Sequence, residues 1–111
     1  MGLERHSFHE KRIDDRVPVF HRTRATDAEG QSLALVIVDL STSGLMARCD
    51  LDLAPDMHIR VTLPVIGVRT ARVRWALGGR IGCAFAPALT PDDYYALLAS
   101  LTQTACDNQA A

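Results

Sequence analysis

The stretch "VRTARVRWALGGRIGCAF", residues 68–85, indicates two antiparallel strands joined by a tight turn. Gly78 and Gly79 separate the two runs, and a Gly-Gly pair favours a type I′ turn because both central residues need a positive φ. Apolar or small side chains recur at every second position, the period of a strand with one buried face. We therefore expect a β-hairpin whose buried face consists of Ala71, Val73, Trp75, Leu77, Ile81, Cys83 and Phe85.

Four further strands are expected before this hairpin. The first begins at Val17, and three more follow at residues 32–40, 45–51 and 57–63. Turn-forming residues separate them in the segments "TDAEGQ", "STSG" and "APD", and "PVIG" leads into the hairpin. Six short strands with short turns are typical of an all-β fold, either a closed antiparallel barrel or a sandwich. Within 57–63, the side chains expected on the buried face are Ile59, Val61 and Leu63.

A single amphipathic helix is expected after the last strand. Thr90 is a good N-cap, Pro91 suits the first helical position, and the carboxylates of Asp92 and Asp93 favour the positive end of the helix dipole. Apolar residues then recur at helical spacing, at Tyr94, Leu97, Leu98 and Leu101. The helix should therefore pack one face against the strands.

The 111 residues suffice for one domain with one core. Residues 16–104 are expected to form the barrel and its C-terminal helix. Residues 1–15 are polar and rich in charge and histidine, and we expect them to form a flexible N-terminal arm. Residues 105–111 are expected to be a frayed tail.

Composition limits the functions that this chain can have. Its formal net charge of −1 argues against DNA or RNA as a partner. No apolar run approaches the ~20 residues that span a bilayer, so we expect no membrane insertion. The three cysteines are widely spaced and form no CxxC, which predicts free thiols and a cytoplasmic location.

Neither a metal site nor an enzyme is predicted. His6, His9 and His21 have no companion cysteine or carboxylate at a ligand spacing, and we expect them to be solvated. Ser41 lacks the G-x-S-x-G setting of a nucleophile, and no glycine-rich phosphate loop is present. We therefore expect no catalytic residue, no metal and no cofactor.

A pair of arginines precedes the first strand, in "KRIDDRVPV" at residues 11–19. On a helix, Arg12 and Arg16 would repel one another, and Pro18 ends any helix close by. In an extended loop, the two guanidinium groups can reach one ligand and bind phosphate or the O6/N7 edge of guanine. Taken alone, such a pair is more often solvated surface charge than a ligand clamp.

A second motif, "DLSTSG" at residues 39–44, follows the most apolar strand. The carboxylate of Asp39 can accept hydrogen bonds from a guanine edge, and Ser41 can bind a phosphate or a base. Gly44 permits a tight turn or a close backbone approach. The simpler alternative is a turn in which Asp39 and Ser41 bind local backbone groups.

Taken together and in this order, the two motifs resemble those of the PilZ family of bacterial cyclic di-GMP receptors. The resemblance covers roughly residues 10–103 and includes the later "VRW…GGRIGCAF" pattern. It implies a six-stranded antiparallel PilZ-type β-barrel with a C-terminal helix. It also implies that Arg12 and Arg16 fold over the dinucleotide, that Asp39 and Ser41 hold its guanine and phosphate, and that Gly44 shapes the turn.

Lys11 is a further candidate for ligand contact, because the residue before the first arginine is thought to influence how many ligands bind in this family. The resemblance implies a receptor that passes its signal to an unidentified downstream protein when the arm becomes ordered. Two alternatives remain. One is a PilZ-like protein-interaction module that does not bind nucleotide, and the other is a small nucleic-acid-binding barrel.

Overall fold

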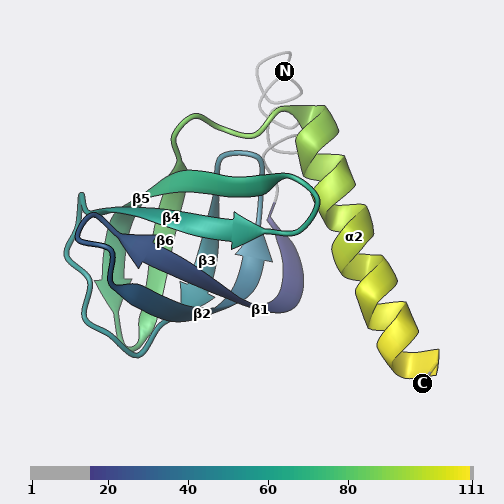
Figure 1. Ribbon diagram of the computed structural model, residues 1–111, viewed down its shortest axis with the longest axis horizontal. Coiled ribbons are helices and arrows are strands. Elements are labelled where there is room, and N and C mark those ends of the chain that lie inside the picture. Colours follow the sequence, from purple (N-terminus) through teal and green to yellow (C-terminus); the bar gives the residue numbers. More distant parts are fainter. Residues whose placement is uncertain (1–15, 111) are drawn as a thin grey trace, which may run out of the picture.

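The computed structural model describes residues 16–110, with side chains through Leu101. The described strands form a closed barrel in the order β1-β2-β3-β6-β5-β4, with every neighbouring pair antiparallel (Figure 1). This confirms the expected six-stranded antiparallel barrel with a C-terminal helix. The elements are β1 (Val17–Asp27), β2 (Ser32–Leu40), β3 (Gly44–Arg48), β4 (His58–Leu63), β5 (Gly67–Leu77), β6 (Arg80–Phe85) and α2 (Pro91–Ala110).

The core fills the inside of the barrel with aliphatic side chains from alternate positions of each strand. In β4, the buried face expected from the sequence is confirmed, since Ile59, Val61 and Leu63 are at most 2% exposed. Burying one such side chain stabilises the fold by roughly 1.5–3 kcal/mol. The largest fully buried side chains come from five of the strands and the helix: Leu33, Leu35, Ile37, Leu40, Leu45, Ile59, Ile81, Leu97, Val61 and Val73.

The tight hairpin between β5 and β6 is also present. Gly78 and Gly79 adopt φ angles of 62° and 79°, in the region that a type I′ turn requires. Cross-strand pairing is regular on the side of the turn, where Leu77 lies opposite Arg80. The sequence therefore predicts this turn correctly at the level of the backbone.

The expected buried face of β5 is wrong beyond Val73. The register with β6 shifts between Val73 and Trp75, so that Arg74 is an extra residue in a β-bulge. A bulge of one residue reverses which side chains face the core. Trp75 and Leu77 are therefore 40% and 80% exposed, and Ala76 packs against the core in their place.

Helix α2 begins as predicted. The Thr90 side-chain oxygen accepts a hydrogen bond from the Asp93 amide at 3.1 Å, and Asp93 forms a 2.9 Å ion pair with Arg69 of β5. Tyr94 is buried against the barrel at this end of the helix. Figure 1 shows α2 lying beside the barrel and continuing past it. The expected start of the frayed tail, residue 105, falls within α2, which runs to Ala110.

Candidate functional site

The turn between β2 and β3 contains the second sequence motif and is closed by Ser41. The Ser41 amide donates to the Gly44 carbonyl at 2.9 Å, and the Gly44 amide donates to Ser41 Oγ at 3.2 Å. Ser41 is only 2% exposed. In this structure its hydroxyl therefore holds the turn together, which is the local role considered as the alternative for this residue.

Three groups from the other end of the chain hold the same turn in place. The Phe85 amide donates to the Ser43 carbonyl at 2.8 Å, and the Leu89 amide donates to the Thr42 carbonyl at 2.9 Å. The Tyr94 hydroxyl approaches the carbonyl oxygen of Leu40, at the end of β2, at 3.4 Å. These bonds fix the turn against the connection between β6 and α2.

Gly44 is required by a close approach of two strands. It is the first residue of β3 and pairs with Ala84 of β6. A Cβ at this position would overlap the backbone carbonyl of Cys83, whereas Gly44 does not have the positive φ of a tight turn. Of the two uses suggested by the sequence, the structure shows close backbone approach.

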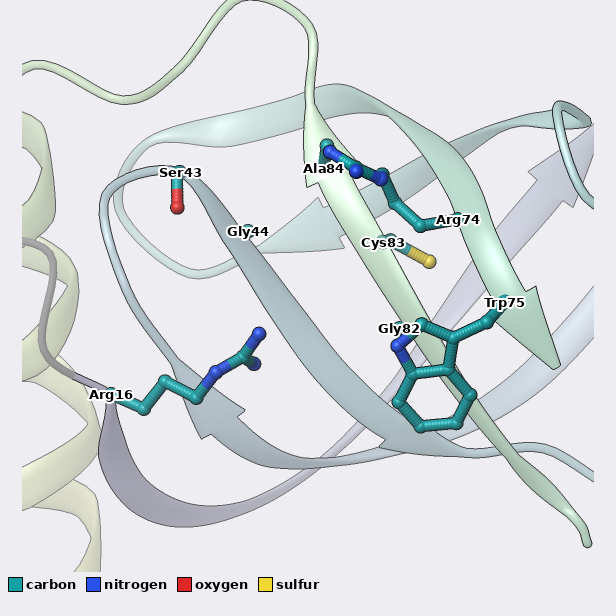
Figure 2. Close-up of a pocket in the computed structure, with 8 residues that line it drawn as sticks. All are labelled: Arg16, Ser43, Gly44, Arg74, Trp75, Gly82, Cys83 and Ala84. Carbon is teal, nitrogen blue, oxygen red and sulfur yellow. The ribbon is translucent and has the colours of Figure 1, made fainter. Parts of the chain in front are cut away.

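A cavity of about 300 Å³ opens beside this turn on the outside of the barrel. This volume lies at the lower end of the range of small-molecule sites. Figure 2 shows the Arg16 side chain reaching toward β3 from one side, and the side chains of Arg74 and Trp75 on the other. The cavity is lined by Arg16, Ser43, Gly44, Arg74, Trp75, Gly82, Cys83 and Ala84.

Arg16 is placed at the cavity by the first residue pair of the sheet. It immediately precedes Val17, which pairs with Leu40 at the end of β2. Arg16 is exposed, and within residues 16–110 its guanidinium has no ion-pair partner. It is therefore available for an anionic group. The other arginine of the motif, Arg12, lies outside the described residues, as does Lys11.

Asp39 lies on the same outer face but does not line the cavity. A cross-strand row connects it through Met46 and Gly82 to Trp75 on β5. Three steps between neighbouring strands separate the Cα atoms of Asp39 and Trp75 by roughly 14 Å. Asp39 is half-buried. A ligand that contacts both residues must therefore extend across β3 and β6.

Trp75 and Arg74 also line the cavity, although the sequence analysis did not select them as site residues. The bulge at Arg74 turns the Trp75 side chain outward, where the indole ring lies over Gly82. A Cβ on Gly82 would overlap the ring, so this glycine makes room for it. The signal in the sequence is the glycine opposite the tryptophan, since Gly in a strand often marks close approach of another group.

The arrangement suits a planar, anionic ligand. Two guanidinium groups can bind phosphate, and an exposed indole can stack on a base. Cys83 also lines the cavity, but its side chain belongs to the buried core and offers no nucleophile, because burial, reinforced by the charge of Cys49, raises the pKa of the thiol to about 12. A thiol with this pKa stays protonated near neutral pH.

The described residues contain no group of three or more potential metal-ligating side chains. His21 is half-buried rather than solvated, and burial lowers its pKa. His6 and His9 lie outside the described residues. Within the described part of the chain, no helix is both long and apolar enough to cross a membrane.

The fold and the sequence were compared with known proteins. The crystal structure of the PilZ domain of CeSA from a cellulose-synthesising bacterium is similar, with a TM-score of 0.56, 19% identity and coverage of 80% of this chain and 96% of that chain. The PilZ domain with c-di-GMP of YcgR from Escherichia coli is similar with a TM-score of 0.58, 18% identity and coverage of 87% and 95%. No curated protein matches. The sequence model of the PilZ domain matches residues 9–103, so the chain belongs to the PilZ domain family.

Proposed function

We propose that this protein is a non-enzymatic receptor for cyclic di-GMP. The observation that carries the proposal is the meeting of Arg16, the Ser41–Gly44 turn and Trp75 around one cavity on the outer face of the barrel. These groups come from three separate parts of the sequence. Their chemistry matches a ligand with guanine bases and phosphates. The similar YcgR domain was solved with c-di-GMP, which supports the same ligand class.

The ligand would lie across β3 and β6. One guanine stacks on the Trp75 indole, and the phosphates bind Arg16 and Arg74, whose guanidinium groups are exposed. Asp39 accepts hydrogen bonds from the N1–H and N2–H₂ groups of the other guanine. Ser41 contributes by holding the turn in shape. Extension over three strand spacings agrees with a dinucleotide better than with a single nucleotide.

Signalling would follow from ordering of the N-terminal arm. Residues 1–15 would fold onto the bound dinucleotide through Arg12, with Lys11 supplying further charge for a phosphate. Ordering the arm costs conformational entropy, which the charge-assisted contacts must offset. The arm and ligand would then present a new surface to a downstream protein.

Calorimetric titration of cyclic di-GMP tests this function. We expect the wild-type protein to bind, and Arg12→Ala and Arg16→Ala to weaken binding by at least about tenfold, or 1.4 kcal/mol. Arg60→Ala is the matched control, because Arg60 is an exposed arginine on β4, outside the cavity. No heat with the wild type, together with unchanged NMR shifts for Arg16, Asp39 and Trp75, would favour the protein-interaction module instead.

A further inference from the structure

A row of arginines crosses the outer face of the barrel beside the cavity, two residues along β5 and β6 from Trp75 and Gly82. Arg22 of β1 pairs with Val36 of β2, which pairs with Arg48 of β3, and Arg48 pairs with Arg80 of β6. Leu77 of β5 completes the row opposite Arg80. We call these five residues the arginine row. Their side chains point outward, since the three arginines are exposed and Leu77 is 80% exposed.

Repulsion between the positive charges of the arginine row destabilises the fold when no partner is bound. Arg48 and Arg80 lie directly opposite one another on paired strands, where like charges destabilise a sheet. Within residues 16–110, none of the three arginines forms an ion pair. The guanidinium of Arg22 lies 5.8 Å from the centroid of the Phe20 ring, in a cation–π contact. Three arginines without an ion-pair partner among the described residues thus share one row, on a chain whose net charge is −1.

We propose that the arginine row is a docking surface for an acidic, partly apolar peptide segment of a partner protein. Charge complementarity supplies the attraction, and carboxylates placed between Arg48 and Arg80 would relieve their repulsion. Val36 lies between two arginines of the row and Leu77 ends it, and both add apolar surface that carboxylates alone would not use. The occupant should therefore combine acidic and aliphatic side chains.

The shape of the barrel favours a peptide over other polyanions. The row spans five neighbouring strands of a closed six-stranded barrel, so it curves around most of the circumference. A flat anionic membrane or a stiff nucleic-acid duplex could touch only part of it at once. A flexible segment can follow the curve. Single-stranded nucleic acid can do so too, and the exposed rings of Phe20 and Trp75 lie beside the row, but the aliphatic side chains of Val36 and Leu77 suit a peptide rather than a base.

Arg80, near one end of the arginine row, should contribute less to peptide binding than Arg48 in the middle. Asp50 and Asp52, in the connection between β3 and β4, line a cavity of about 370 Å³ together with Arg80 and Leu77. Their carboxylates lower the positive potential around Arg80 without forming an ion pair with it among the described residues. We therefore expect Arg48, in the middle of the row, to contribute most to binding.

The test is fluorescence anisotropy of a labelled synthetic peptide in which glutamates and leucines are interspersed with serines. We expect saturable, salt-sensitive binding to the wild type, and binding at least about tenfold weaker to Arg48→Glu. Arg80→Glu should weaken it less. Arg60→Glu is the matched control, because it makes the same charge change on β4, the strand that the row does not cross, and should leave binding unchanged.

Two further measurements separate this proposal from its alternatives. Arg48→Thr removes the like-charge pair, and it should raise the melting temperature while weakening the peptide complex. A peptide with lysine in place of glutamate should not bind. Equal effects of Arg48→Glu and Arg60→Glu would overturn the proposal. The proposal would also be overturned if polyuridylate or phosphatidylglycerol vesicles bound with the same dependence on Arg48 while the peptide did not bind.

This inference rests on the proposed function only for the existence of a partner. The peptide assay contains no nucleotide, and cyclic di-GMP binding by the same variants is measured separately by calorimetry. A variant that loses peptide binding but still binds cyclic di-GMP therefore shows an effect on the arginine row and not on the nucleotide site.

Discussion

The indole ring of Trp75 covers Gly82 on the neighbouring strand so closely that a methyl group on Gly82 would overlap the ring. Trp75 is the only tryptophan in the chain, so the tryptophan fluorescence of the protein comes from this position. We expect cyclic di-GMP to quench the emission of the wild-type protein if a guanine stacks on the ring.

Gly82→Ala should displace the ring without unfolding the barrel, since the atoms in the way belong to a surface side chain. We expect a shift in the emission maximum and weaker cyclic di-GMP binding. Gly30→Ala is a control for the emission spectrum, because Gly30 lies in the β1–β2 turn with nothing within 4 Å of the added methyl, although its φ of 84° strains any side chain there and so lowers stability. An unchanged emission spectrum in Gly82→Ala would contradict the contact.

Gly44→Ala should destabilise the fold far more than Gly82→Ala. Here the added methyl meets the Cys83 backbone carbonyl, so β3 and β6 must move apart. We expect a loss of about 3 kcal/mol in the free energy of unfolding for Gly44→Ala and less than about 1 kcal/mol for Gly82→Ala. Urea unfolding of the two variants measures both, and similar losses would argue against the close approach.

Stability should decrease as the pH falls below about 6.5. Burial lowers the pKa of His21 from 6.5, so the unfolded chain binds a proton more readily than the folded one. The free energy of unfolding therefore decreases as pH falls through 6.5 toward the lower folded-state pKa, and the deficit persists below it. We expect His21→Gln to flatten this part of the pH profile.

Cys83 should resist thiol reagents in the folded protein. Its pKa is raised to about 12, first by burial and then by the charge of Cys49, so almost no thiolate is present at pH 8. In a Cys49→Ser/Cys106→Ser protein, Ellman's reagent should react with Cys83 slowly when folded and rapidly in denaturant. Replacing Cys49 also removes its charge, which is the smaller of the two causes of the raised pKa of Cys83. A fast reaction in the folded state would therefore show that burial does not hold the thiol protonated.

The sequence predicts the barrel well because strand period and turn chemistry are local properties. The alternation of Ile59, Val61 and Leu63 and the Gly78–Gly79 turn can be read directly from the chain. The end of β5 could not be read in this way. Trp75 and Leu77 continue the alternation of the strand, and only pairing with β6 shows that Arg74 is an extra residue.

The candidate site shows the same division between local and long-range information. The positions of Arg16 and Gly44 near one another follow from the order of motifs and strands, and the structure places both at one cavity. The burial of Ser41 depends on the β2–β3 turn, and that turn is anchored by Phe85 and Leu89 from far along the chain. No spacing in the sequence reveals those bonds.

Closure of the barrel restricts how any partner can bind. Each of the six strands is paired on both sides along part of its length, so the described sheet has no free edge strand. Pairing of β1 with β4 covers only Ala25–Asp27, so a partner peptide that adds a strand, a common mode of peptide recognition, has an open edge on the earlier part of β1. Where strands are paired on both sides, recognition must be made by side chains on the outer face. Substitutions there should alter partner choice while leaving the backbone pairing of the barrel intact.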